Sequence, residues 1–211
     1  MKKSKSLLIV AVMLAVITVT AVTPTFSWLS SETEPVINTF AGGAIALKLD
    51  EAPVDANGQK LDGARVQANT YKYTAGAELW KDPTPTVLKG SDRCYVFLYV
   101  ENELNDLFAI NYDTQNWLKV AEKGNGAVYA YFTRVDTSAS NEDQVLAPIF
   151  TTITVSDELT AQDVEELGTK QLNVTAYAVQ AASLDSADAI ELAAANFEVG
   201  DGEVDTGVVI A

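Results

Sequence analysis

Histidine is absent from the 211 residues of this chain. Without it, the sequence holds no Ser-His-Asp triad, no Cys-His pair and no H-E-x-x-H zinc motif. The glycines do not follow the spacing of a phosphate-binding loop either, since neither G-x-x-x-x-G-K nor G-x-G-x-x-G occurs. These absences exclude the commonest hydrolases and nucleotide-binding enzymes. We therefore expect no catalytic residues, and a protein that is not an enzyme.

Cysteine occurs once, as Cys94, so no internal disulfide can form. Cys94 lies in the apolar run CYVFLYV (94–100), where a thiol usually packs as a small hydrophobic group. We expect it to be buried and structural. The alternative is a reactive or intermolecular thiol.

Basic residues are scarce: 14 Lys and Arg stand against 29 Asp and Glu, a net charge of −15. Such a chain repels nucleic-acid phosphates and anionic membranes, so no nucleic-acid partner is expected. Paired carboxylates are expected mostly at turns and exposed helix faces, where water solvates them; they are Asp50-Glu51, Glu101 with Glu103, Glu142-Asp143, Asp157-Glu158 and Glu165-Glu166. We expect no cofactor and no dedicated metal site, with weak calcium binding on acidic loops as the alternative.

The one long hydrophobic run, residues 7–22, follows a basic start that contains Lys2, Lys3 and Lys5. It falls short of the roughly 20 apolar residues of a membrane-spanning helix, and no basic flank follows it. The pattern predicts a secretory signal peptide over residues 1–27, cleaved between Ser27 and Trp28. Cleavage after Ala21 and a retained anchor are the alternatives. In each case the protein leaves the cytoplasm, and only an uncleaved signal would contact the membrane.

Beyond residue 36 the chain reads as short strands separated by turns. Period-two alternation, or β-branched and aromatic residues, predict strands at 36–40, 44–50, 65–75, 94–100, 147–155 and 170–180, with a hairpin over 116–135. The run 94–100 is apolar on both alternating faces, which is typical of a central strand covered on both sides. Pro83 and Pro85 cannot donate to a β-ladder, so their segment is expected to be an edge strand or an extended crossover.

Two segments are expected to be helical: 156–167, which ends at Gly168, and 183–197, with Asp185 or Ser186 as its N-cap. Many short strands with regular turn signals predict an all-β fold with minor α content. We expect a jelly-roll-like antiparallel β-sandwich with one or two short helices, formed by residues 28–211 as a single domain.

Three blocks of the sequence together resemble a known family. They are TPTFSWLSSETEPVINTFAGGAIALKLDE (23–51), WKDPTPTVLKGSDRCYVFLYVEN (80–102) and LNVTAYAVQAASLDSADAIEL (172–192). The chain is similar to the TasA/camelysin (CalY) family, which Gram-positive bacteria secrete through a dedicated SipW-type signal peptidase. Asn38-Thr39-Phe40 and Gly43 match an N-T-F-x-x-G element that leads into the first strand of that family.

The resemblance implies a jelly-roll sandwich exported to the cell surface, where subunits assemble into biofilm-matrix fibres by donor-strand exchange. Camelysins have been described as metalloproteases, but the absence of histidine and of a zinc motif argues against that activity here. On this basis residues 28–43 are the candidate donor segment. The residues expected to form the donor strand itself are Val36, Ile37, Asn38, Thr39 and Phe40.

The leading hypothesis is a secreted structural protein of the cell surface or extracellular matrix, with itself as partner and other matrix or cell-wall components as further candidates. Physically, an exposed sheet edge can accept an extended strand from a neighbour, and residues 28–43 contain no lysine to block pairing. Residues 36–50 can instead form the first strand of their own sandwich. The alternative function is a monomeric, adhesin-like surface module that binds calcium or a carbohydrate.

Overall fold

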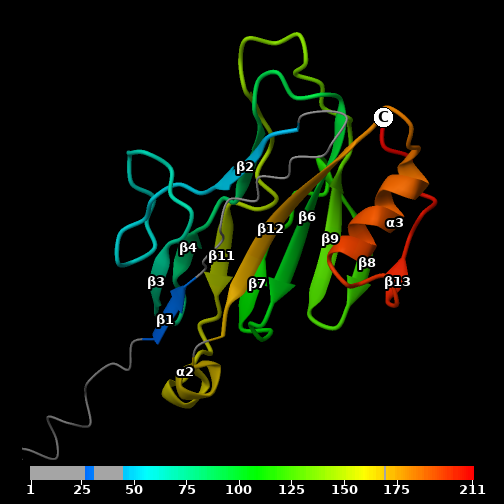
Figure 1. Cartoon of the computed structure of the whole chain (residues 1–211). Helices are drawn as coiled ribbons and strands as arrows, with labels where there is room; N and C mark the ends of the chain where they lie inside the picture. Colours follow the sequence, from blue (N-terminus) through cyan, green and yellow to red (C-terminus); the bar gives the residue numbers. More distant parts are fainter. Residues whose placement is uncertain (1–26, 31–44, 169) are drawn as a thin grey trace, which may run out of the picture.

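The computed structural model describes residues 27–30, 45–168 and 170–211, which form an antiparallel β-sandwich with two short helices (Figure 1). The fold class expected from the sequence is confirmed. The predicted signal segment, apart from Ser27, and the candidate donor strand at 36–40 lie outside the described residues.

One layer of the sandwich is a five-stranded antiparallel sheet. Its strand order is β12 (Leu172–Gln180), β6 (Cys94–Asn102), β9 (Gly126–Tyr131), β8 (Trp117–Lys123) and β13 (Glu203–Val204). β8 and β9 form the predicted hairpin, and Gly124 takes the positive φ of 60° that its tight turn needs.

Smaller sheets form the opposite layer. One has the order β10 (Gln144–Val145), β5 (Thr84–Val87) and β2 (Leu47–Asp50). Another has the order β4 (Glu78–Trp80), β11 (Thr152–Val155) and β7 (Phe108–Ile110). A two-stranded pair joins β1 (Ser27–Ser30) to β3 (Thr70–Tyr73).

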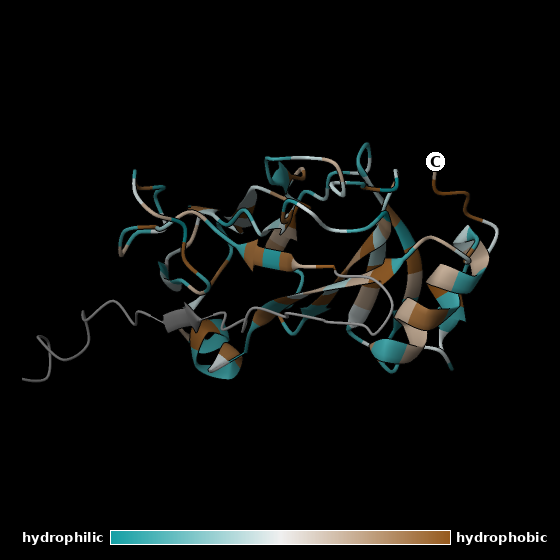
Figure 2. Ribbon diagram, turned by 45° about the horizontal axis from the view of Figure 1, so that its top comes forward, coloured by the Kyte–Doolittle hydropathy of each residue, from teal (hydrophilic) through white to brown (hydrophobic). Residues whose placement is uncertain are grey.

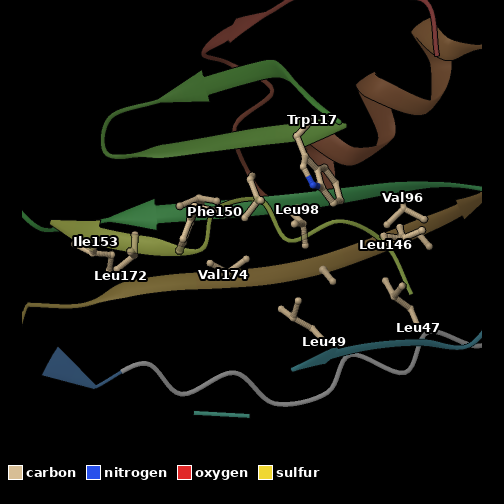
Figure 3. Packing of buried hydrophobic residues seen from close by; sticks show 14 of the residues in the cluster. Leu47, Leu49, Val96, Leu98, Trp117, Leu146, Phe150, Ile153, Leu172 and Val174 are labelled. Carbon is tan, nitrogen blue, oxygen red and sulfur yellow. The ribbon is translucent and has the colours of Figure 1, made fainter. Parts of the chain in front are cut away.

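The five-stranded sheet separates two hydrophobic cores, and β6 contributes to both. Val96 and Leu98 belong to the core between the two layers (Figure 3). Tyr95 and Phe97 belong to the second core, which α3 (Ser186–Asn196) covers from the other face of the sheet (Figure 1). The prediction that 94–100 is a central strand with two buried faces is therefore confirmed. In Figure 2 the strands of the sandwich carry much of the hydrophobic colour, and the connecting loops carry much of the hydrophilic colour.

Both helices begin at capping side chains. Thr160 caps α2 (Ala161–Leu167) and forms a capping box with Asp163, and Gly168 follows the last turn with φ of 51°. Asp185, one of the two predicted N-caps, accepts the backbone N–H of Asp188 at the start of α3.

The expectation for the proline-containing segment was wrong, because β5 is the central strand of its sheet and Pro85 lies within it. The carbonyl of Pro85 accepts the N–H of Leu146 at 2.9 Å, so the backbone of Pro85 faces the β10 side. β10 pairs only with Thr86 and Val87. The missing N–H of Pro85 thus falls where this ladder ends, and the pairing of β5 with β2 loses no donor.

Candidate functional site

β12 forms one edge of the five-stranded sheet, and two hydrogen bonds show which of its backbone groups point outward. The N–H of Glu103 donates to the carbonyl of Gln171 at 3.0 Å, and the N–H of Ala181 donates to the carbonyl of Arg93 at 2.8 Å. Because backbone groups alternate along an antiparallel strand, odd-numbered residues of β12 bond to β6. Even-numbered residues direct their N–H and C=O away from the sheet; they are Leu172, Val174, Ala176, Ala178 and Gln180.

The side chains of the first four of these residues are apolar and buried. Leu172, Val174, Ala176 and Ala178 are each at most 2 % exposed and face the core between the layers. Within the part of the chain that the structure describes, β6 is the one strand that pairs with β12. An added strand would find hydrogen-bonding groups along the edge, and its own apolar side chains would extend this core.

β2 presents a second outer edge beside β12. The N–H of Leu88 donates to the carbonyl of Ala46 at 2.9 Å, so alternation directs the backbone groups of Leu47 and Leu49 away from β5. Both leucines are buried, and Figure 3 shows them beneath β12 on the same side of the sandwich. The candidate donor segment immediately precedes β2 in the sequence. We name the outer edges of β12 and β2 together the open side.

Of the other residues singled out from the sequence, Ser27 and Trp28 lie in β1. Ser27 is opposite Tyr73, and Trp28 is opposite Lys72. The donor residues lie outside the described part of the chain, so no contact between them and the open side is described; they are Val36, Ile37, Asn38, Thr39 and Phe40.

Most of the paired carboxylates lie where the sequence placed them. Glu142-Asp143 and Asp157-Glu158 are exposed in loops, and Glu165-Glu166 is exposed on α2. Across residues 45–168 and 170–211, no group of three or more Cys, Asp or Glu side chains is arranged to hold a metal ion. Calcium binding on the acidic loops therefore stays a prediction without a described site.

Asp50-Glu51 departs from the expectation of solvated carboxylates, because each residue is only 3 % exposed. Arg65 compensates the first of them: its Nε lies 2.5 Å from Asp50 Oδ1, and its Nη1 lies 3.1 Å from Asp82 Oδ2. Its Nη2 donates to Thr84 Oγ1 and to the carbonyls of Asp50 and Asp82. Burial opposes the charge of Arg65, but these carboxylates outweigh it and raise the pKa of the guanidinium.

Glu51 is held by a separate set of partners. Its Oε2 accepts Lys81 Nζ at 2.9 Å, and its Oε1 accepts Asn69 Nδ2 at 3.0 Å. Lys81 is 2 % exposed, so this ion pair is one of the most buried polar contacts described. We name Glu51, Asn69 and Lys81 the buried triad.

Sequence reasoning missed Arg65, Asn69 and Lys81. No local pattern joins them to their partners, since the contacts of Arg65 and Lys81 span 15, 17 and 30 residues. Charged residues at the end of a strand are usually solvated. Here the segment that contains Arg65 and Asn69 returns to contact Asp50 and Glu51. Tertiary structure was needed to find them.

Cys94 is fully buried in the core between the layers, as predicted. Burial, together with the nearby charges of Asp136 and Asp92, raises the pKa of its thiol from an ordinary 9.0 to about 12.

We expect the thiol of Cys94 not to react with a thiol-directed reagent at pH 8 in the native protein, and to react fully in urea. Rapid native labelling would contradict a structural role. Because the native thiol resists ionisation, native stability should fall as the pH rises above about 9.

Among the described residues, no helix combines the length and the apolar character needed to cross a bilayer. Comparisons with protein-family models, with curated proteins and with solved structures found no match to this chain.

Proposed function

We propose that the protein is a secreted structural subunit that forms homopolymeric fibres at the cell surface or in the extracellular matrix. In this proposal the N-terminal segment 28–43 of one copy adds as a strand to the open side of the next. The observation that carries the proposal is the outer edge of β12, where outward-directed backbone groups alternate over buried apolar side chains. The sequence resemblance to a family of fibre-forming matrix proteins supports the same function.

The candidate donor strand is compatible with that edge in length and pattern. Five extended residues span about 17 Å, so residues 36–40 fit along the nine residues of β12. Val36, Asn38 and Phe40 would share one face of the strand, with Ile37 and Thr39 on the other. The segment 36–43 also lacks proline and lysine, the residues that commonly block pairing at an edge.

Assembly and intramolecular pairing are compatible with each other. The donor segment is continuous with β2, so it can complete the open side of its own subunit before assembly. Exchange of an element within the chain for the same element of a neighbour is a low-cost route to oligomers. Open-ended exchange between successive copies then produces a fibre.

Electron microscopy of the purified protein comprising residues 28–211 tests this proposal. We expect fibres at high protein concentration, and none after deletion of residues 28–43, because the deletion removes the donor but leaves Ile45 and β2 in the core. Circular dichroism provides the folding control. Unchanged fibres from the shortened protein would contradict strand donation. Folded monomers from both proteins would favour the alternative, a monomeric surface binding module.

A further inference from the structure

The buried triad brings an amine, an amide and a carboxylate together away from water. Both nitrogens contact one carboxylate: Lys81 Nζ is 2.9 Å from Oε2 of Glu51, and Asn69 Nδ2 is 3.0 Å from Oε1. Lys81, Glu51 and Asn69 are 2 %, 3 % and 8 % exposed. The side-chain amine of Lys81 and the side-chain amide of Asn69 are therefore bridged by one carboxylate, that of Glu51.

The buried ammonium of Lys81 makes fewer hydrogen bonds than it has donors. It has three N–H donors, and the one hydrogen-bond acceptor that the described residues offer it is Glu51. Its other close neighbour is the ring of Tyr71, whose centroid is 5.7 Å away. An ion pair buried with unused donors is energetically poor, so a reaction that removes the charge from Lys81 would be favourable.

The amide of Asn69 is held in one orientation. Its Nδ2 donates to Glu51 and, at 2.8 Å, to the carbonyl of Ala52, while its Oδ1 accepts the backbone N–H of Val54 at 3.1 Å. When an amine attacks the carbonyl carbon of an amide, negative charge develops on the amide oxygen. Here a backbone N–H already donates to that oxygen. Glu51 touches the nitrogen that would leave.

We propose that Lys81 and Asn69 become joined by an intramolecular isopeptide bond, with Glu51 as the catalytic proton-transfer residue. The bond would form within the folded chain without another enzyme. This proposal is independent of fibre assembly.

The reaction needs no reagent from outside. Glu51 Oε2 takes a proton from Lys81, and the neutral Nζ attacks Cγ of Asn69. Negative charge develops on Oδ1, where Val54 N–H donates to it. Glu51 returns the proton through Oε1 to Nδ2, the Cγ–Nδ2 bond breaks to release ammonia, and the ammonia takes the remaining extra proton of Nζ. The products are one ammonium ion and an amide bond between Lys81 Nζ and Asn69 Cγ, and Glu51 is again a carboxylate.

The bond would close the base of a loop in the fold. Asn69 directly precedes β3, and Lys81 directly follows β4, so the link would tie together the two ends of the segment that carries both strands. β3 is the strand that pairs with β1. The N-terminal strand would thus be paired to a covalently closed loop.

Peptide mass spectrometry of the purified full-length mature protein tests the proposal. Trypsin cuts after unmodified lysine and arginine, so it would cut at Arg65, Lys72 and Lys89 but not at an acylated Lys81. We expect a branched product in which peptide 66–72 is joined to peptide 73–89, lighter than their sum by one ammonia, about 17 Da. Recovery of linear 66–72 and 73–81 alone would overturn the proposal.

Variants separate the roles of the three residues. Glu51→Gln should abolish the branched peptide, and its persistence would overturn the catalytic role of Glu51. Asn69→Asp keeps the shape of the side chain and should give the same branched peptide, with loss of water in place of ammonia. Its absence from folded Asn69→Asp protein would overturn the assignment of position 69. Lys89→Arg, at an exposed lysine, is the matched control and should retain the link.

Discussion

Ala176→Pro should abolish fibre formation while the sandwich remains folded. The N–H of Ala176 points away from β6, so proline at this position removes a donor from the outer edge and leaves the pairing with β6 intact. The pyrrolidine ring would also obstruct a strand that approaches this edge. Electron microscopy and circular dichroism of the variant measure the two effects separately.

Thr175→Pro is the matched control, one residue away on the same strand. Thr175 lies opposite Tyr99 and directs its N–H toward β6, so this change breaks the ladder between two strands of the core sheet. We expect it to destabilise the monomer by about 1–3 kcal/mol, because it leaves a buried carbonyl without its donor. Normal fibres from folded Ala176→Pro protein would rule out the outer edge of β12 as the acceptor.

Arg65→Ala should be among the most destabilising single substitutions in this protein. It leaves the carboxylate of Asp82, which is 5 % exposed, without its cation, and it leaves that of Asp50, which is 3 % exposed, with Lys48 alone. Removal of one partner from a buried ionic group costs about 3–5 kcal/mol. We expect about 3 kcal/mol, the lower end, because the side chain of Arg65 is itself 33 % exposed.

Urea denaturation measures this loss as a shift in the transition midpoint. Arg65→Lys should recover only part of it, since an ammonium cannot reproduce the planar contacts of Arg65 with Asp50, Asp82 and Thr84. Arg93→Ala, at an exposed arginine, should change the free energy of unfolding by less than about 0.5 kcal/mol. Equal stabilities for Arg65→Ala and Arg93→Ala would show that the buried carboxylates do not depend on Arg65.

The elements that could be predicted were those specified by neighbouring residues. The two apolar faces of β6, the Gly124 turn between β8 and β9, and the cap at Asp185 each depend on a few consecutive positions. The burial of Cys94 followed from its place in β6. Such features are local, so the alternation and turn chemistry of a single sequence are enough to find them.

The features that could not be predicted depend on which segments become neighbours. Pro85 is tolerated in a central strand because the β10–β5 ladder ends next to it, so the N–H that proline lacks is not needed there. The outer edge of β12 is defined by pairing with β6, some 70 to 90 residues away in the sequence. The donor role of residues 36–40 and secretion stay predictions.

By itself, the sequence determined the all-β class, the main strands, the two helices and the absence of histidine-based chemistry. Only the tertiary structure decided which strand edges form the open side and which charges are buried. The physical reason is the range of the interactions: alternation and capping act over a few residues, whereas sheet order and the burial of Asp50, Glu51 and Lys81 depend on contacts between distant segments.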